Sequence, residues 1–416
     1  MKFLQIIIVS LMSLLLVSSC GTSQKINKYN SADAYVNDFP DAFMQYQIYH
    51  LNDSLSELFI RIDAAKIPSL QSKQLDVYSL MRLTFGVYSS MNKKDMLQSA
   101  SYKLSDFVAY KDLDNTATEI RIPLKIKQNN SYVLIWSLQD QVNKRNYYKL
   151  LRLEKNKNSS FNIRFLNADN QLIWKKWLEP NDQVRLQYRY GSVNELVMDY
   201  YKPKFSPGLP PYMEAAAVDN NQVFEQHSLS LENGISSLVQ PPKKGVYAIR
   251  SSKDELCVAS MPLFYKDFAL DLTPAQKVFS LRYLNNRKEF GNMLKDEPAH
   301  TIKEFWFFEG RSKERSQKMM KTYYDRTIRA NALFSGYKEG WKTDRGMIFM
   351  IYGPPDVVYQ EIDREVWEYG DEAAYNDLRF EFVRKQSKYN TQEFILIRDQ
   401  DYKKSWYKVV ENWRSK

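Results

Sequence analysis

The chain opens with an apolar stretch that constrains where the rest of it folds. Lys2 is followed by an uncharged, mainly apolar run from Phe3 to Val17. A basic residue, a short apolar segment and small residues after it form the pattern of a secretory signal. The run is about 15 residues long, whereas a helix needs about 20 to cross a bilayer. We therefore expect residues 1–19 to be a cleaved signal peptide, and the rest to fold as a soluble protein after export.

The end of this stretch predicts how the mature chain is anchored. Val17-Ser18-Ser19-Cys20 resembles the lipobox of bacterial lipoproteins. The resemblance implies cleavage before Cys20 and attachment of acyl chains such as palmitate to that residue. Because each buried CH₂ contributes about 0.8 kcal/mol, several chains hold a protein on a membrane. Residues 20–54 are then expected to be the lipidated cysteine and a tether.

The composition predicts folded domains and argues against nucleic-acid binding. Hydrophobic residues make up 44% of the chain and aromatic residues 14%, which is ample for packed cores. The net charge is +10, but basic and acidic residues are interleaved through most of the sequence. No basic run with interleaved aromatics is present that would follow a phosphate backbone. We therefore expect no nucleic-acid partner.

The remaining cysteine does not look catalytic. Cys257 has no intramolecular disulfide partner once Cys20 is acylated, and it lies in an apolar, strand-like context. A catalytic thiol would need a nearby histidine, and His50, His227 and His300 lie in unrelated contexts. We interpret Cys257 as a small buried hydrophobe.

Two β-rich regions are expected first, at residues 55–160 and 161–272. Ile120–Ile126 and Val184–Tyr190 alternate apolar and polar side chains, with the period of a half-buried strand. Residues 75–88 are also expected to form a strand. Short strands separated by polar turns are typical of sandwiches, so we expect two tandem immunoglobulin-like β-sandwiches.

A proline-rich loop interrupts the second region. Residues 203–211 contain four prolines and Gly208, and prolines cannot join a central β-ladder. Two interpretations remain open: a docking element for another protein, extending to Tyr212, or a rigid crossover between strands.

A helical segment is expected at residues 273–335. Thr273-Pro274-Ala275-Gln276 places a capping residue, proline at the first helical position and glutamine three residues after the cap. Thr301 and Glu304 suggest a second capping box. A third helix is expected from about Ser312 to Leu333.

The last segment, residues 336–416, is expected to be a small α+β domain. Met347–Tyr352 is a run of six apolar residues bounded by glycines, which predicts a buried strand. Three further strands are expected around residues 366–369, 378–382 and 394–397, completing a four-stranded antiparallel sheet. Apolar residues spaced three to four apart between Tyr402 and Trp413 predict a closing helix.

Two motifs in this segment resemble a known family. They are Gly340-Trp341-Lys342-Thr343-Asp344 followed by Arg345-Gly346, and Tyr352-Gly353-Pro354-Pro355-Asp356. Together they resemble the GWxTD domain, a family found largely in envelope proteins of Bacteroidota and related Gram-negative bacteria. The resemblance covers about residues 300–416. The family has no established activity, so the resemblance names the module without naming a reaction.

A looser resemblance concerns a later strand. A strand ending in Gly-Pro, followed by a strand with Trp367 and Tyr369, resembles small accessory lipoproteins of the outer-membrane β-barrel assembly machinery. The motif residues are therefore candidates for a structural or binding role.

An enzyme remains an alternative. Paired carboxylates can perform acid–base chemistry or hold a hard cation, and the sequence offers Asp344, Asp356, Asp363, Glu365 and Glu368. Asp344 and Asp356 lie at turn positions with ordinary structural uses for aspartate, and Glu365 and Glu368 look like the solvent face of a strand. No signature of a serine hydrolase, metalloprotease, phosphate loop or dinucleotide site is present. We therefore expect no catalytic residues, no metal and no cofactor.

The sequence thus predicts a non-enzymatic accessory or scaffold lipoprotein in an envelope assembly or secretion complex. Gly21 after Cys20, with no acidic cluster following it, resembles sorting to the periplasmic face of the outer membrane. The expected partners are the membrane, through the lipid, and an outer-membrane protein complex. A surface-exposed glycan- or protein-binding lipoprotein is the alternative, and a carboxylate-dependent hydrolase is less favoured.

Overall fold

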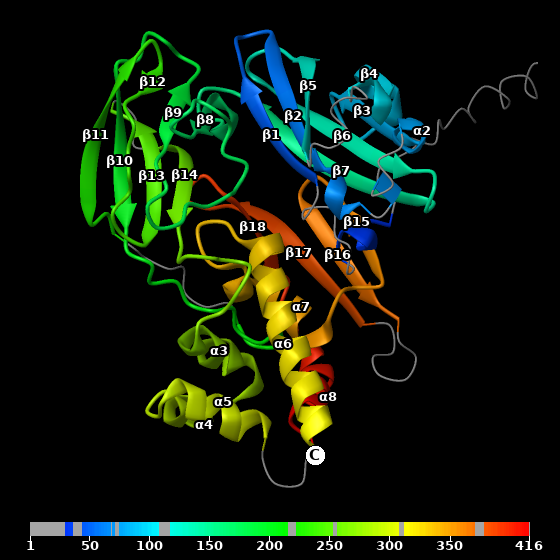
Figure 1. Ribbon diagram of the computed structural model, residues 1–416, viewed down its shortest axis with the longest axis vertical. Coiled ribbons are helices and arrows are strands. Elements are labelled where there is room, and N and C mark those ends of the chain that lie inside the picture. The colour runs from blue at the N-terminus through cyan, green and yellow to red at the C-terminus, as the bar shows by residue number, and fades with distance from the viewer. Residues whose placement is uncertain are drawn as a thin grey trace, which may run out of the picture.

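The computed structural model describes residues 30–35, 44–67, 69–70, 75–107, 117–214, 222–252, 256–307, 312–370 and 378–415. Two β-rich lobes lie side by side at the top of Figure 1, and a part built of helices and a sheet lies below them. The predicted signal peptide and Cys20 lie outside the described residues. Within the described ranges, no helix combines the length and the apolar character needed to cross a membrane.

The first lobe consists of two antiparallel sheets, with the strand orders β1-β2-β5 and β4-β3-β6-β7. Ile60 and Ile122 of the first sheet share one buried core with Leu83 and Trp136 of the second. The apolar faces of the two sheets therefore meet, as in a sandwich. The elements of this lobe are β1 (Met44–His50), β2 (Leu55–Asp63), α2 (Leu75–Ser79), β3 (Met81–Tyr88), β4 (Met96–Lys103), β5 (Ala117–Lys125), β6 (Asn130–Asp140) and β7 (Arg145–Lys155).

This lobe differs from the sequence-based expectation in two places. Strand β1 lies within residues 20–54, which we expected to be a tether. It pairs with β2 along its whole length and buries Met44 and Ile48 in the core. Residues 75–79, which we expected to be part of a strand, form helix α2.

The second lobe is one continuous antiparallel sheet of seven strands that curls into a nearly closed barrel. Its order is β14-β13-β10-β11-β12-β9-β8. Strand β11 pairs with β10 along most of its length and with β12 at its end, which joins the two halves of the sheet without a break. The strands are β8 (Ile163–Leu166), β9 (Arg185–Tyr188), β10 (Glu195–Tyr201), β11 (Glu225–Glu232), β12 (Ile235–Ser236), β13 (Gly245–Ser251) and β14 (Cys257–Leu263).

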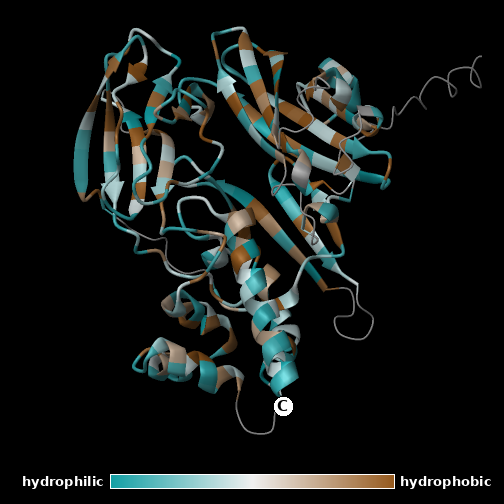
Figure 2. Ribbon diagram, viewed as in Figure 1, coloured by the Kyte–Doolittle hydropathy of each residue, from teal (hydrophilic) through white to brown (hydrophobic). Residues whose placement is uncertain are grey.

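The alternation of side chains explains both lobes. Figure 2 shows hydrophobic and hydrophilic residues alternating along many of their strands. In β5 every second residue from Ile120 to Leu124 is buried, and the residues between them are exposed. One face of each such strand therefore contributes to a core, which is the main stabilisation of an antiparallel sheet.

Helices follow the second lobe. Helix α3 (Pro274–Ser280) begins with the expected capping box, in which Thr273 and Gln276 bond each other's backbone amides. Helix α5 (Pro298–Trp306) instead begins at Glu297, whose side chain accepts from His300 N, so Thr301 lies inside the helix. The other helices are α4 (Arg287–Met293), α6 (Lys313–Phe334), α7 (Asp344–Tyr352) and α8 (Tyr402–Arg414).

The expectation of a buried strand at residues 347–352 is wrong, because this segment is most of helix α7. Thr343 caps the helix by accepting a hydrogen bond from Gly346 N over 3.0 Å. Helix α7 contacts α6, α8 and the C-terminal sheet, and every residue from Gly346 to Tyr352 is buried. Because this helix is covered on all sides, it has no polar face, and its sequence lacks the apolar–polar periodicity that would indicate a helix.

The C-terminal sheet is a four-stranded antiparallel meander, β15-β16-β17-β18. Its first strand follows helix α7, where we had expected strand 347–352 to provide it. The sheet and helices α6 to α8 share a large core that includes Phe349, Trp367, Phe380 and Trp406. The strands are β15 (Val357–Gln360), β16 (Arg364–Tyr369), β17 (Leu378–Gln386) and β18 (Gln392–Leu396).

Residues 30–35 lie against this C-terminal sheet. Asn30 forms a bridge with Tyr359 of β15, and Ser31 N donates to Val358 O over 2.9 Å. The Ala32–Tyr35 turn then buries Tyr35 in the core of the C-terminal part. The chain therefore enters the fold at its C-terminal sheet before it builds the first lobe.

Candidate functional site

The turn from Gly340 to Gly346 is built on direct backbone contact. A Cβ atom at Gly340 would overlap the carbonyl oxygen of Ala330 in helix α6. A Cβ atom at Gly346 would overlap the carbonyl oxygen of Gly340. Both glycines are therefore required, because the turn at Gly340 packs directly on helix α6 and the start of helix α7 packs directly on that turn.

Trp341 and Thr343 stabilise this turn through hydrogen bonds. Trp341 is buried, and the Tyr283 hydroxyl donates to its carbonyl oxygen over 2.9 Å. Asn331 accepts from Trp341 N at 3.2 Å. The Thr343 hydroxyl donates to Gly340 O over 2.7 Å while it caps helix α7.

Asp344 is buried in an ion pair. Its Oδ1 atom accepts from Arg398 Nη2 at 2.6 Å, and its Oδ2 atom accepts from Leu396 N at 2.9 Å. Burial raises the pKa of Asp344, and the Arg398 guanidinium opposes that shift. Both carboxylate oxygens are therefore committed to partners within the chain.

The same arginine holds the proline-rich loop. Arg398 Nη1 donates to Leu209 O at 2.6 Å and to Pro210 O at 2.8 Å. Gly208 N donates to Lys342 O over 2.8 Å, and Tyr212 stacks on Tyr407. The loop that we considered as a docking element for another protein is docked onto the C-terminal part of its own chain.

The second motif closes the other end of helix α7. Gly353 has φ of +96°, a conformation that favours glycine, and its carbonyl oxygen accepts from Tyr369 OH at 2.9 Å. Tyr352 is buried with its hydroxyl 3.2 Å from Ser405 Oγ. Pro354 and Pro355 then end the helix, because neither has an N–H to continue it.

Asp356 has a different environment from Asp344. It is exposed, and its Oδ2 atom accepts from Gly370 N at 2.9 Å. Asp344 begins helix α7 and Asp356 follows its end, so a helix roughly 13 Å long lies between them. The two motif aspartates share no partner and do not form a carboxylate pair.

The other carboxylates considered for an enzyme are also dispersed. Asp363 is exposed and pairs with Arg152 of the first lobe at 3.1 Å. Glu368 is half-buried, opposite Arg379 in the sheet. Among the described residues, no group of three or more His, Cys, Asp or Glu side chains is arranged to hold a metal ion.

Glu365 differs most from expectation, because we placed it on the solvent face and it is 2% exposed. Its Oε1 atom accepts from Tyr35 OH at 2.6 Å and from Trp367 Nε1 at 2.5 Å. Its Oε2 atom accepts from Arg345 Nη1 at 3.2 Å. Glu365 therefore ties the entering segment of the chain to the motif helix and the C-terminal sheet.

Arg345 and Glu365 also line a cavity of about 450 Å³ where the three parts of the molecule meet. The first lobe contributes Tyr46 and Lys149, the second contributes Met261, and β17 contributes Arg384. The described residues that line it include six basic side chains and two acidic ones. The basic ones are Lys149, Arg164, Lys175, Lys176, Arg345 and Arg384.

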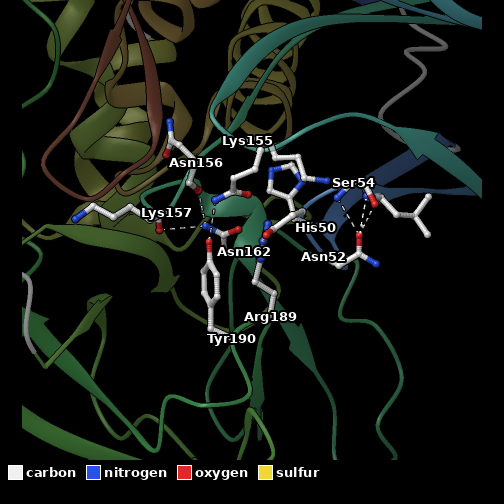
Figure 3. A network of polar contacts seen from close by, with 12 residues as sticks. His50, Asn52, Ser54, Lys155, Asn156, Lys157, Asn162, Arg189 and Tyr190 are labelled. Atoms are coloured by element: carbon white, nitrogen blue, oxygen red, sulfur yellow. Dashed lines mark hydrogen bonds and ion pairs between the residues drawn. The ribbon is translucent and has the colours of Figure 1, made fainter.

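A second polar cluster lies in the first lobe, where the ends of strands β1 and β7 meet β2; Figure 3 shows His50 and Lys155 of this cluster. His50, Ser56 and Lys155 are 0% exposed. Lys155 Nζ donates to Ser56 Oγ over 3.0 Å, and Ser56 Oγ lies 2.8 Å from His50 Nδ1. The Ser56 hydroxyl accepts from the ammonium, and its own proton is then available for an unprotonated Nδ1.

The electrostatics of this cluster favour a neutral imidazole. His50 Nε2 lies 3.1 Å from the carbonyl oxygen of Glu154, which only accepts, so Nε2 carries the ring proton. Burial lowers the pKa of His50 to about 4 and the pKa of Lys155 to about 8. No solvent reaches Ser56, so a substrate has no access to its hydroxyl in this arrangement.

Sequence reasoning missed this cluster. His50 and Lys155 end two strands of different sheets, and Ser56 lies in a third strand. The sequence contains no signal for the cluster beyond a histidine and a lysine at strand ends. Cys257 lies at the start of β14, and burial raises the pKa of its thiol to about 12, so it carries no thiolate at neutral pH.

Comparison with known proteins gives one informative match. No curated protein matches this sequence. The C-terminal domain of the AgI/II polypeptide BspA of Streptococcus agalactiae aligns at 8% identity and a TM-score of 0.18, covering 53% of this chain and 97% of that one. A second structure, BspA_C_WT, aligns with the same values. These alignments carry no inference.

The match that does carry an inference is to a family. Residues 245–415 match the GWxTD domain. The match begins at β13, earlier than the resemblance at about residue 300 suggested, and so includes the last two strands of the second lobe. It contains both motifs, the Asp344–Arg398 pair and the Arg345–Glu365 pair. Residues 245–415 of this chain are therefore a GWxTD domain.

Proposed function

We propose that the protein is an outer-membrane-anchored, periplasm-facing lipoprotein. In this proposal it is a non-enzymatic scaffold or accessory subunit of an envelope assembly or secretion complex. The GWxTD domain is its membrane-proximal base, and the two β-rich lobes, as immunoglobulin-like modules, present surfaces to the partner.

The observation that carries the proposal is the attachment of Asn30–Tyr35 to the C-terminal sheet. Ser31 N bonds Val358 O, and Asn30 Oδ1 accepts from Val358 N at 2.9 Å. Tyr35 OH bonds the buried Glu365. The segment that follows the predicted lipid anchor is thus fastened to the GWxTD domain by several hydrogen bonds.

This attachment limits how far the body can lie from the membrane. Ten residue steps separate Cys20 from Asn30, and they reach about 35 Å at full extension. An acylated Cys20 would therefore hold the C-terminal sheet within about 35 Å of the bilayer. A short tether of this kind suits a subunit that acts beside a membrane-embedded partner.

The internal use of the motif residues supports a scaffold over a hydrolase. Both oxygens of Asp344 and both oxygens of Glu365 accept hydrogen bonds from neighbouring segments. Arg398 joins Asp344 to the loop at Leu209 and Pro210. These carboxylates therefore join the entry segment, the proline-rich loop and the motif helix into one body.

The test is affinity purification of the tagged, lipidated protein from mildly solubilised membranes, read by mass spectrometry. Stoichiometric recovery of an outer-membrane barrel or secretion component supports the proposal. The matched control is Cys20→Ser, which should lose acyl labelling and leave the membrane fraction. Recovery of the lipidated protein alone, under conditions that preserve other envelope complexes, overturns the scaffold role.

The orientation needs a separate measurement. Protease treatment of intact cells should leave the mature chain uncut if it faces the periplasm, and should cut it after the outer membrane is permeabilised. Digestion of the chain on intact cells overturns the periplasmic orientation and favours the surface-exposed binding protein.

A further inference from the structure

The cavity between the two lobes and the GWxTD domain contains a guanidinium group with unsatisfied hydrogen-bond donors. The Nε and Nη1 atoms of Arg384 are buried and have no hydrogen-bond partner among the residues that the structure describes. Arg384 lies on β17 and lines the cavity. A buried charge is unfavourable unless it is paired and hydrogen-bonded. A bound anion would therefore stabilise this guanidinium.

A second guanidinium lies beside it. Arg345 and Arg384 both contact the ring of Phe394, with distances of 4.1 Å and 5.2 Å from each guanidinium carbon to the ring centroid. Glu365 accepts from Arg345, but its oxygens already serve three donors. Glu365 thus has no oxygen reserved for Arg384, although Glu365 and Asp363 both act on Arg384 electrostatically. Burial and the proximity of Arg345 both lower the pKa of Arg384, as expected for excess positive charge.

Two other basic residues of the cavity have polar partners that do not line it. Arg164 Nε donates to Gln187 Oε1 at 2.8 Å, and Lys175 pairs with Glu179 at 3.1 Å. The partner of Lys175 is its own near neighbour in sequence and does not line the cavity. The lining therefore has more basic than acidic side chains, and Arg384 and Arg345 are the two whose guanidinium groups share the Phe394 ring.

The lining of the cavity also offers a further polar atom and apolar side chains. Ser260 of β14 lines the same cavity, and its hydroxyl oxygen is buried without a hydrogen-bond partner in the described part of the chain. Phe161, Ile173 and Met261 also line the cavity. A volume of about 450 Å³ lies within the range of small-molecule sites. The site thus combines unsatisfied donors with an apolar wall.

We propose that this cavity binds a small oxyanion with an apolar or aromatic body, held by Arg384 and Arg345 and completed by the Ser260 hydroxyl. Planar guanidinium groups suit carboxylate and phosphate headgroups. The apolar wall would cover the body of the ligand. Because the site is lined by all three parts of the molecule, its occupant would also stabilise their arrangement. This inference is independent of the scaffold proposal.

The test is calorimetric titration of the full mature chain with four probes. Inorganic phosphate tests the headgroup alone, and phenyl phosphate and phenylacetate test the two headgroups with the same aromatic body. Benzyl alcohol is the neutral control. We expect saturable binding of phenyl phosphate or phenylacetate, and the tighter of the two identifies the headgroup.

Two substitutions on one strand provide the matched comparison. Arg384→Met should weaken binding of the preferred probe by at least about tenfold, as expected for loss of a charge-assisted hydrogen bond. Arg379→Met removes an exposed arginine from the same strand and should leave binding unchanged. Without ligand, Arg384→Met should melt at the same temperature as the parent or higher, because it removes an unpaired buried charge. A higher melting temperature also shows that the variant folds.

Three results would overturn the proposal. They are the absence of saturable binding for both aromatic anions, equal binding by the parent and Arg384→Met, and binding of benzyl alcohol as strong as that of the anions. If Arg384→Met fails to fold, Arg384→Lys keeps the charge but changes the donor geometry. Unchanged affinity in Arg384→Lys would then count against a guanidinium site.

Discussion

Asp344 and Arg398 form a buried ion pair of 2.6 Å in which the arginine also holds the carbonyl oxygens of Leu209 and Pro210. The pair joins the start of helix α7 to the segment that follows β18 and to the proline-rich loop. The aspartate of the GWxTD motif therefore fastens a distant loop to the domain.

Loss of Asp344 should be costly. Asp344→Ala leaves the Arg398 guanidinium buried with its carboxylate removed, and leaves Leu396 N without its acceptor. Removing one member of a buried pair typically costs about 3–5 kcal/mol. We expect the free energy of unfolding to fall by this order in urea denaturation. Limited proteolysis should also cut the loop around Leu209 more rapidly.

The other motif aspartate is the matched control. Asp356 is exposed, and its side chain accepts one hydrogen bond, from Gly370 N. We expect Asp356→Ala to cost about 1 kcal/mol, as for a single hydrogen bond. Equal losses for the two variants would contradict a structural role that is specific to Asp344.

The motif glycines should tolerate no side chain. Gly340→Ala would place a methyl group on the Ala330 carbonyl oxygen, which belongs to backbone and cannot rotate away. Overpacking of this kind costs about 1–3 kcal/mol or more, and we expect a lower melting temperature. Gly291, inside helix α4, has open space at its Cβ position. Gly291→Ala should therefore raise stability by about 0.5–1 kcal/mol. A neutral Gly340→Ala variant would contradict the close contact.

The helices and strands that could be predicted are those whose own residues, or residues next to them in sequence, form a recognisable pattern. Helix α3 begins at Thr273, Pro274 and Gln276 because these residues form its cap. Strand β5 alternates with period two because one of its faces is buried. Helix α7 could not be recognised, because Met347–Tyr352 is buried on every side and such a run has the same pattern in a helix and in a strand.

The candidate site was even less accessible from the sequence. Arg345 was visible as part of the motif, but Arg384 and Ser260 lie in separate strands that tertiary structure brings to one cavity. Glu365 looked like a solvent-facing residue because its neighbours alternate, yet Tyr35 covers it from a segment that is distant in sequence. Contacts of this kind depend on how segments that are distant in sequence pack together, and no local sequence pattern predicts that packing.

Cys257 should react slowly in the native state. Its Sγ atom lies 3.1 Å from Ala259 O, and burial raises the pKa of the thiol to about 12. Because thiolate is the reactive form, we expect slow labelling by a disulfide reagent at pH 8 and rapid labelling in denaturant. Rapid labelling of the native protein would contradict the buried environment of Cys257.

The His50 cluster should make stability depend on pH. When His50 is protonated, its Nδ1 atom also carries a proton, and Ser56 Oγ then faces two donors, His50 and Lys155. The folded-state pKa is about 4, below the ordinary value of 6.5. The unfolded chain therefore binds more protons between these values, so stability falls as pH decreases from 6.5 to 4.

The loss between pH 6.5 and pH 4 should be at most about 3.5 kcal/mol, since one pKa unit corresponds to about 1.4 kcal/mol. Urea midpoints at pH 7 and pH 4.5 measure it by comparing the parent with His50→Gln, which keeps polar atoms but does not titrate. We expect the midpoint of the parent to fall more steeply towards pH 4.5 than that of His50→Gln. His300 is exposed, so His300→Gln should follow the parent. If His50→Gln and the parent lose stability in parallel, the acid sensitivity arises elsewhere and is not caused by protonation of His50.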